Sequence, residues 1–260
     1  MKKLFVLIAA ACMTCTAAFA QTVKPFKEGE RAVFLGNSIT DGGHYHSYIW
    51  LYYMTRFPDM PIRVFNGGIG GDTAYDMNKR LDGDIFAMKP SVLMVTFGMN
   101  DSGYFEYNGD KPKEFGEQKY QESIKNYQQM EKRFKDLPDT RIVMVGTSPY
   151  DETVQLKENT PFKTKNETIK RLVEYQKESA AKNNWEFTDL NAPMTAINQQ
   201  YQQKDPTFTL CGSDRIHPDN DGHMVMAYLF LKAQGFVGKE VADMEINANK
   251  KQVVKSENCT

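Results

Sequence analysis

The stretch Ala32-Val33-Phe34-Leu35, followed by Gly36-Asn37-Ser38, decides the fold class of this chain. The four leading residues are apolar on both faces of a strand, which is typical of a parallel strand covered by helices on each side. Similar runs recur between longer amphipathic stretches, at residues 62–65, 92–97, 142–145 and 185–188. This alternation predicts an α/β protein, a three-layer α/β/α sandwich with parallel strands joined by right-handed crossovers.

Amphipathic helices are predicted between and after these strands. In residues 114–137, apolar side chains recur at spacings of three and four, and we assign this stripe to core packing. Its members are Tyr120, Ile124, Tyr127, Met130, Phe134 and Leu137. A last helix is predicted to begin at Asp221 as its N-cap, with His223 facing solvent in the first turn. Its apolar side is predicted to consist of Met224, Tyr228 and Leu231.

The composition is that of an ordinary globular protein. The chain has 260 residues, 32 Lys and Arg against 33 Asp and Glu, a formal charge of −1, and 41% apolar residues. This balance disfavours a nucleic-acid binder, a disordered acidic segment and a polytopic membrane protein, and it leaves the oligomeric state open. We expect one large domain over residues 21–237. Residues 238–260 are predicted to be a tail that forms a strand pair or opens a further module.

Residues 1–20 have the pattern of a secretory signal peptide. Lys2 and Lys3 precede an apolar stretch at residues 4–11, and an Ala-Phe-Ala triplet occupies residues 18–20. Cleavage after this triplet leaves no transmembrane segment and predicts a periplasmic or secreted protein. Cleavage at Cys12, with lipid anchoring at that cysteine, is the alternative.

Cysteine and histidine usage bears on disulfides and metals. After removal of the predicted signal peptide, two cysteines remain, Cys211 and Cys259. An oxidising compartment allows them either to form a disulfide or to stay as free thiols. Apart from His44 and His46, the histidines are not clustered in the sequence. We therefore expect no metal site.

Polar residues and glycines stand where the predicted strands end, which is the edge at which parallel sheets bind ligands. Ser38 is the predicted nucleophile, His217 its general base, and Asp214 the carboxylate that orients the imidazole. The backbone amides of Ser38 and Gly71 and the side-chain amide of Asn100 are predicted to form an oxyanion hole. We attribute the glycine at position 71 to a close approach of substrate to the backbone.

Four blocks of the sequence carry a resemblance to a known family. They are Gly36-Asn37-Ser38-Ile39-Thr40, Gly71, Gly98-Met99-Asn100-Asp101 and Asp214-Arg215-Ile216-His217. In order and separation they resemble the blocks of the SGNH (GDSL-type) hydrolases, over about residues 31–236. The resemblance implies a flavodoxin-like five-stranded parallel sheet, catalysis by Ser38, Gly71, Asn100 and His217, and no cofactor. The first block departs from the family pattern at Asn37, where Asp is usual, and at Ile39, where Leu is usual.

The substrate is predicted from the mouth of this site. Tyr104 and Tyr107 are predicted to bind substrate, because aromatic rings stack on sugar faces. Residues 100–113 are polar apart from their rings, which favours a small acyl group, above all an acetyl ester on a sugar. We therefore predict an exported serine esterase acting on an acetylated glycan. Two alternatives stay open: a lysophospholipase or thioesterase using the same residues, and a glycan-binding module that has lost turnover.

Overall fold

The computed structural model of the chain describes residues 22–240 and 242–257. The predicted signal peptide at residues 1–20, the alternative lipid anchor at Cys12 and the cysteine at position 259 all lie outside the described residues. Cys211 is a buried free thiol in the structure, which does not describe Cys259, the other cysteine of the two alternatives.

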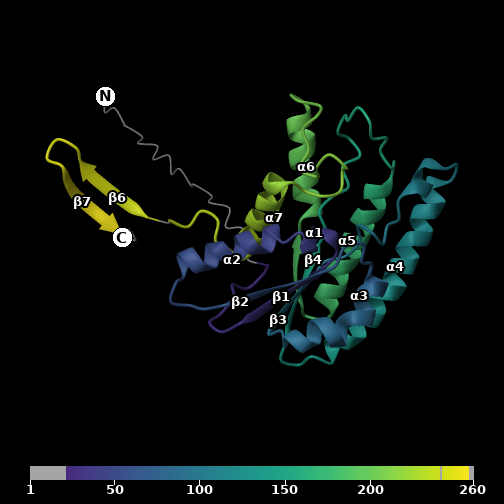
Figure 1. Cartoon of the computed structure of the whole chain (residues 1–260), viewed down its shortest axis with the longest axis horizontal. Helices are drawn as coiled ribbons and strands as arrows, with labels where there is room; N and C mark the ends of the chain where they lie inside the picture. Colours follow the sequence, from purple (N-terminus) through teal and green to yellow (C-terminus); the bar gives the residue numbers. More distant parts are fainter. Residues whose placement is uncertain (1–21, 241, 258–260) are drawn as a thin grey trace, which may run out of the picture.

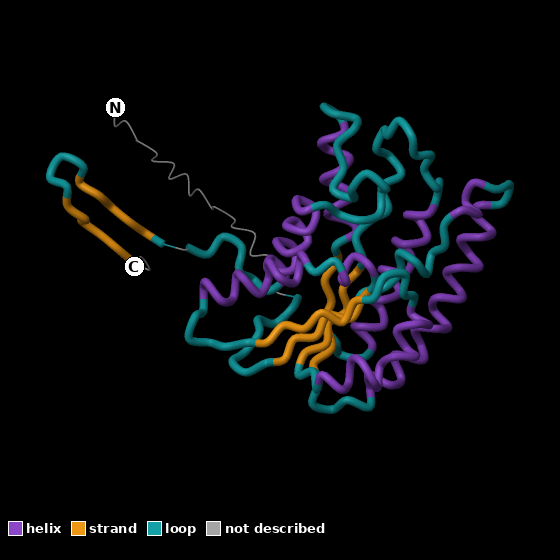
Figure 2. The backbone as a smooth tube through the Cα atoms, viewed as in Figure 1, coloured by secondary structure: helices purple, strands orange, loops and turns teal. Residues whose placement is uncertain are grey.

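The centre of the protein is a parallel sheet of five strands. These are β1 (Arg31–Gly36), β2 (Arg63–Gly68), β3 (Val92–Val95), β4 (Arg141–Gly146) and β5 (Glu186–Asp189). Their spatial order is β2-β1-β3-β4-β5, and all neighbouring pairs are parallel. Figure 2 shows the sheet enclosed by helices on both faces. The predicted α/β sandwich with a flavodoxin-like sheet is confirmed.

Seven α-helices connect and follow these strands in the part of the chain that the structure describes. They are α1 (Ser38–Asp41), α2 (His44–Arg56), α3 (Ala74–Arg80), α4 (Pro112–Lys135), α5 (Lys165–Lys182), α6 (Asn191–Gln202) and α7 (Asn220–Ala233). Shorter helical turns are η1 (Leu81–Ile85), η2 (Phe86–Met88) and η3 (Phe105–Asn108).

Successive side chains along each strand point to opposite faces of the sheet, and this divides the core into two layers. On β1, Ala32 and Phe34 pack with α2 and α7, whereas Val33 and Leu35 pack with α3 and α4. The two helix layers are visible on opposite sides of the strands in Figure 1. Because both faces are covered, every strand position must be apolar in the centre of the sheet, which explains the continuous apolar runs in the sequence.

The predicted helix over residues 114–137 is confirmed as α4, with Tyr127, Met130 and Phe134 fully buried. The prediction for the last helix was wrong in two respects. Asp219 is at the N-cap position of α7, and Asp221 lies inside the first turn. The buried face is also rotated: His223 is only 5% exposed, whereas Met224 is 52% exposed. The face of α7 is decided by its packing against α2, which periodicity within α7 alone does not reveal.

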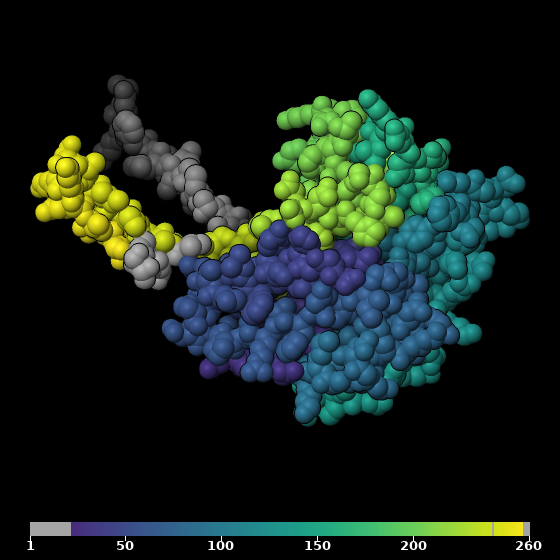
Figure 3. All heavy atoms as spheres, in the orientation of Figure 1, coloured from purple at the N-terminus to yellow at the C-terminus, as the bar shows by residue number. Residues whose placement is uncertain are grey.

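The described chain after residue 241 forms an antiparallel strand pair, β6 (Asp243–Asn247) and β7 (Gln252–Glu257). This hairpin stands away from the α/β body, as the yellow segment in Figure 3 shows. It forms a sheet of its own and does not extend the five-stranded sheet. Within the described residues, no helix combines the length and the apolar character needed to cross a membrane.

Candidate active site

Ser38 is separated from β1 by one residue, Asn37, and lies at the first position of the short helix α1. The Asn37 side chain caps this helix, because its Oδ1 accepts a hydrogen bond from the backbone N–H of Ile39 at 3.1 Å. A Cβ at position 36 would come within 2.1 Å of Thr40 Oγ1, so the tight turn from β1 into α1 requires glycine there. The turn fixes the hydroxyl of Ser38 at the carboxyl edge of the sheet.

The structure brings Ser38, His217 and Asp214 together in a hydrogen-bonded chain. Ser38 Oγ lies 2.7 Å from His217 Nε2, although the two residues are 179 positions apart in the sequence. His217 Nδ1 lies 2.5 Å from Asp214 Oδ2. This hydrogen bond raises the pKa of His217, and partial burial acts in the opposite direction. Burial acts to raise the pKa of Asp214, but hydrogen bonds from His217 and from the backbone amide of Ile216 outweigh it and lower the pKa.

The loop that holds Asp214 and His217 is anchored by Arg215, for which the sequence predicted no role. Arg215 is 1% exposed, and its guanidinium donates hydrogen bonds to the carbonyl oxygens of Val154 at 2.7 Å and Asn159 at 2.6 Å. Its backbone has a φ of 69°, a conformation that non-glycine residues adopt only where the surroundings enforce it. These partners lie 56 to 61 residues earlier, so no local pattern could have identified this anchor.

The loops after β2 and β3 meet at Asn100. Asn100 Nδ2 donates a hydrogen bond to the backbone oxygen of Asp72 at 2.9 Å, and the Asp72 carboxylate pairs with Arg80 at 2.6 Å. Gly71 precedes this contact with a φ of 83°. A Cβ there would meet no atom within 4 Å, so the left-handed backbone, rather than crowding by the protein, is what requires glycine in the free molecule.

Tyr104 contacts the predicted oxyanion donor itself. Its hydroxyl donates to Asn100 Oδ1 at 2.5 Å, and its ring lies 3.9 Å below the ammonium group of Lys165. Lys165 is fully buried and donates hydrogen bonds to Met99 O at 2.7 Å and Ser102 Oγ at 2.6 Å. Sequence reasoning missed Lys165, since a lysine on a predicted helix is ordinarily solvated.

The prediction that Tyr107 binds substrate was wrong. Tyr107 is 3% exposed; its hydroxyl donates to Ser102 O at 2.8 Å and forms a second hydrogen bond with the hydroxyl of Thr168 at 2.9 Å. The ring therefore secures the loop after β3 against α5. It does not reach the mouth of the site, because the 3₁₀ turn η3 directs Tyr107 into the core while Phe105 remains 80% exposed.

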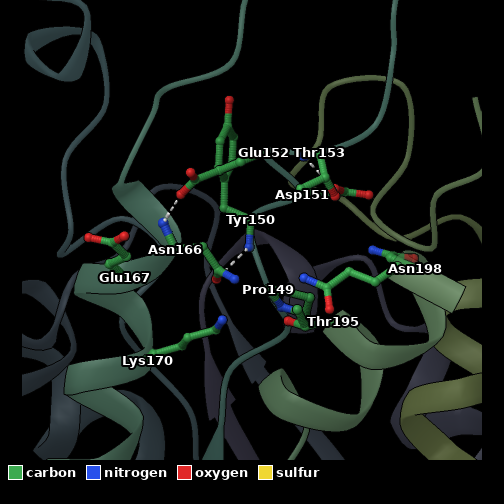
Figure 4. A pocket seen from close by; sticks show the side chains of 11 residues that line it. Pro149, Tyr150, Asp151, Glu152, Thr153, Asn166, Glu167, Lys170, Thr195 and Asn198 are labelled. Carbon is green, nitrogen blue, oxygen red and sulfur yellow. Dashed lines mark hydrogen bonds between the residues drawn. The ribbon is translucent and has the colours of Figure 1, made fainter. Parts of the chain in front are cut away.

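A separate polar cavity of about 170 Å³ lies beyond the end of β4, beside α5 and α6 (Figure 4). Two of its polar groups already have partners: Glu152 accepts the backbone N–H groups of Thr164 and Asn166, and Asn166 Oδ1 accepts from Tyr150 N and Asn191 Nδ2. We attribute this cavity to the connection between β4 and α5. Among the described residues, no group of three or more His, Cys, Asp or Glu side chains is arranged to hold a metal ion.

The class of the protein follows from this fold and from its relatives. A profile of the GDSL-like lipase/acylhydrolase family matches residues 34–225, well over half of the chain. The chain belongs to this family, and it is by class a carboxylic ester hydrolase.

The chain is also similar to particular proteins of known name or structure. An acetylxylan esterase of Geobacillus stearothermophilus is 27% identical over 224 residues, which cover 80% of this chain and 95% of the relative. A crystal structure of that esterase has a TM-score of 0.63 at 24% identity, covers 81% of this chain and 96% of its own, and shows the likeness of fold. A structure of a gut microbial diltiazem-metabolizing enzyme is 84% identical with a TM-score of 0.89 over 93% of this chain. This chain spans 55% of the length of that enzyme.

Proposed function

We propose that the chain is an exported serine esterase that removes small acyl groups, above all acetyl groups, from carbohydrate. The observation that carries the proposal is the hydrogen-bonded chain Ser38, His217 and Asp214, with contacts of 2.7 and 2.5 Å. A serine hydroxyl is a weak nucleophile until a base takes its proton, and an imidazole serves as that base when a carboxylate holds its other nitrogen.

The reaction would proceed through an acyl-enzyme. Ser38 Oγ attacks the ester carbonyl while its proton passes to His217 Nε2, and the carbonyl oxygen becomes an oxyanion. We infer that the backbone amides of Ser38 and Gly71 and the side-chain amide of Asn100, which follow β1, β2 and β3 in the sequence, donate to this oxyanion. His217 then protonates the leaving alcohol. Water, deprotonated by the same imidazole, attacks the acyl-serine and releases the carboxylic acid.

Acetylated carbohydrate is supported as the substrate class by one relative, which is named as an acetylxylan esterase. A secretory leader at residues 1–20 would deliver the esterase to the periplasm or the exterior, where polysaccharides are found. The rival lipid or thioester function would need a long apolar stretch at the entrance of the site, whereas residues 100–113 are polar apart from their aromatic rings.

The decisive experiment compares the wild type with Ser38→Ala on the 4-nitrophenyl esters of acetate and octanoate and on acetylated xylan. Ser38→Ala should fold normally and lose about 10⁶-fold in turnover. Ser47→Ala, which changes an exposed serine on α2, is the matched control and should retain activity. Preference for octanoate would favour the lysophospholipase or thioesterase. A protein that neither turns over nor reacts at Ser38 with a serine-directed reagent would be the binding module.

A further inference from the structure

A polar hollow of about 420 Å³ opens beside the predicted general base. Its lining residues are His44, Pro218, Asp219, Asn220, Asp221 and His223. Pro218 directly follows His217 in the sequence, and the imidazole of His217 faces Ser38. The volume of the hollow lies within the range of roughly 300–1,000 Å³ typical of small-molecule sites.

His223 is the unusual member of this lining. It is 5% exposed, and its Nδ1 is buried with no hydrogen-bond partner. The ring is held by stacking on His44, with centroids 5.1 Å apart, and on Tyr45, with centroids 6.0 Å apart. Burial, followed by repulsion from the neighbouring histidines, lowers the pKa of His223 to about 4, so the ring is neutral at neutral pH. A buried imidazole held this firmly, with no partner in the protein, is a group left for a ligand to satisfy.

The chemistry of ester cleavage decides which part of a substrate this hollow would meet. In the tetrahedral intermediate at Ser38, the oxygen of the leaving alcohol must accept its proton from His217 Nε2. The alcohol portion of the substrate therefore lies on the His217 side, and the oxyanion faces the loops of Gly71 and Asn100. His217 is one of the histidines that act electrostatically on His223, which lines the hollow, and we therefore infer that the hollow lies on the side of the alcohol.

We propose that this hollow is the subsite for the sugar unit that carries the leaving hydroxyl, and that it selects neutral sugars. The inference rests on the proposed esterase function. The carboxylates of Asp219 and Asp221 make no ion pair with the described residues and can accept hydrogen bonds from sugar hydroxyl groups. Two carboxylates in one hollow also repel an anionic uronate or sialate. The neutral imidazole of His223, which lines the same hollow, contributes a further hydrogen bond.

The test compares kcat/KM on an acetylated xylooligosaccharide with kcat/KM on ethyl acetate, whose alcohol is too small to fill the hollow. In Asp219→Asn and in His223→Gln, the ratio of sugar ester to ethyl ester should fall about tenfold, the effect of one to two lost hydrogen bonds. Met224→Ser is the control, because Met224 is adjacent on α7 but exposed outside this hollow, and its ratio should not change. Asp219 is exposed, so Asp219→Asn should fold normally. This variant therefore still tests the proposal if His223→Gln, which alters a buried side chain, fails to fold.

A charge test addresses the predicted selectivity. The double variant Asp219→Asn and Asp221→Asn should raise the activity on acetylated pectin relative to acetylated xylan by several-fold, because the repulsion is removed. An unchanged ratio in every variant would overturn the subsite.

Failure of the esterase itself is distinguishable, since the wild type would then hydrolyse neither ester. The subsite would in that case be judged by titrating xylobiose into the wild type and into Asp219→Asn. Weaker binding by the variant supports the subsite, and no binding to the wild type refutes it.

Discussion

Replacing Tyr104 by phenylalanine removes one hydroxyl group and leaves the ring beneath Lys165 in place. That hydroxyl donates to Asn100 Oδ1 at 2.5 Å, while Asn100 Nδ2 donates to Asp72 O at 2.9 Å. The two contacts together fix which way the Asn100 amide points. Without the hydroxyl, the amide retains only the contact to Asp72, and orientations that turn Nδ2 away from the oxyanion become populated.

The size of the effect follows from the contact that is lost. One hydrogen bond contributes about 0.5–1.5 kcal/mol net, which corresponds to a two- to tenfold fall in the fraction of correctly oriented amide. We therefore expect kcat of Tyr104→Phe on 4-nitrophenyl acetate to fall roughly two- to tenfold, with KM nearly unchanged. Asn100→Ala sets the upper limit, because complete removal of one oxyanion donor costs about 10²- to 10³-fold.

Tyr107→Phe is the matched control on the same loop. Its hydroxyl contacts Ser102 and Thr168 and not Asn100, so the variant should lose about 1 kcal/mol in the free energy of unfolding and keep its kcat. If Tyr104→Phe instead raises KM and leaves kcat intact, Tyr104 binds substrate directly, as the sequence suggested, and the positioning argument is refuted.

Three further predictions concern pH and backbone conformation. The hydrogen bond to Asp214 raises the pKa of His217, so kcat/KM of the wild type should fall as the pH drops through that raised value. A pH-rate profile of Asp214→Asn should show this acid limb at lower pH and a kcat about 10⁴-fold lower. Burial lowers the pKa of Lys165 from 10.5 to about 7, so the unfolded chain binds more protons between these values. Relative to Lys165→Met, the free energy of unfolding of the wild type should rise with pH across that window, as denaturant titrations would measure. Gly71→Ala should reduce kcat on 4-nitrophenyl acetate and cost about 1 kcal/mol in stability, since φ is 83°; unchanged kinetics and melting would contradict the backbone argument.

Part of the candidate site could be predicted from the sequence, because several of its residues follow the ends of the predicted strands. Ser38 and Asn100 stand in recognisable blocks after β1 and β3, because parallel strands deliver their following residues to one edge of the sheet. His217 stands in a recognisable block before α7, and the tertiary structure brings it to Ser38. The residues that hold those blocks in place had no such signal. Arg215 and Lys165 anchor the site loops by hydrogen bonds to backbone groups between 56 and 66 residues away, and a lysine or arginine in a sequence does not reveal whether it will be buried.

The sequence by itself determined the fold class, the order of the strands along the chain, and the core stripe of α4. These follow from local rules: continuous apolar runs for strands covered on both faces, and three- and four-residue spacing for a helix covered on one face. Tertiary structure alone decided which face of α7 is buried, so His223 became part of a hollow and Met224 became exposed. It also turned Tyr107 inward and joined Tyr104 to Asn100. The physical reason is that burial of a side chain depends on what covers it, and the covering element, such as α2 over α7, comes from a distant part of the chain.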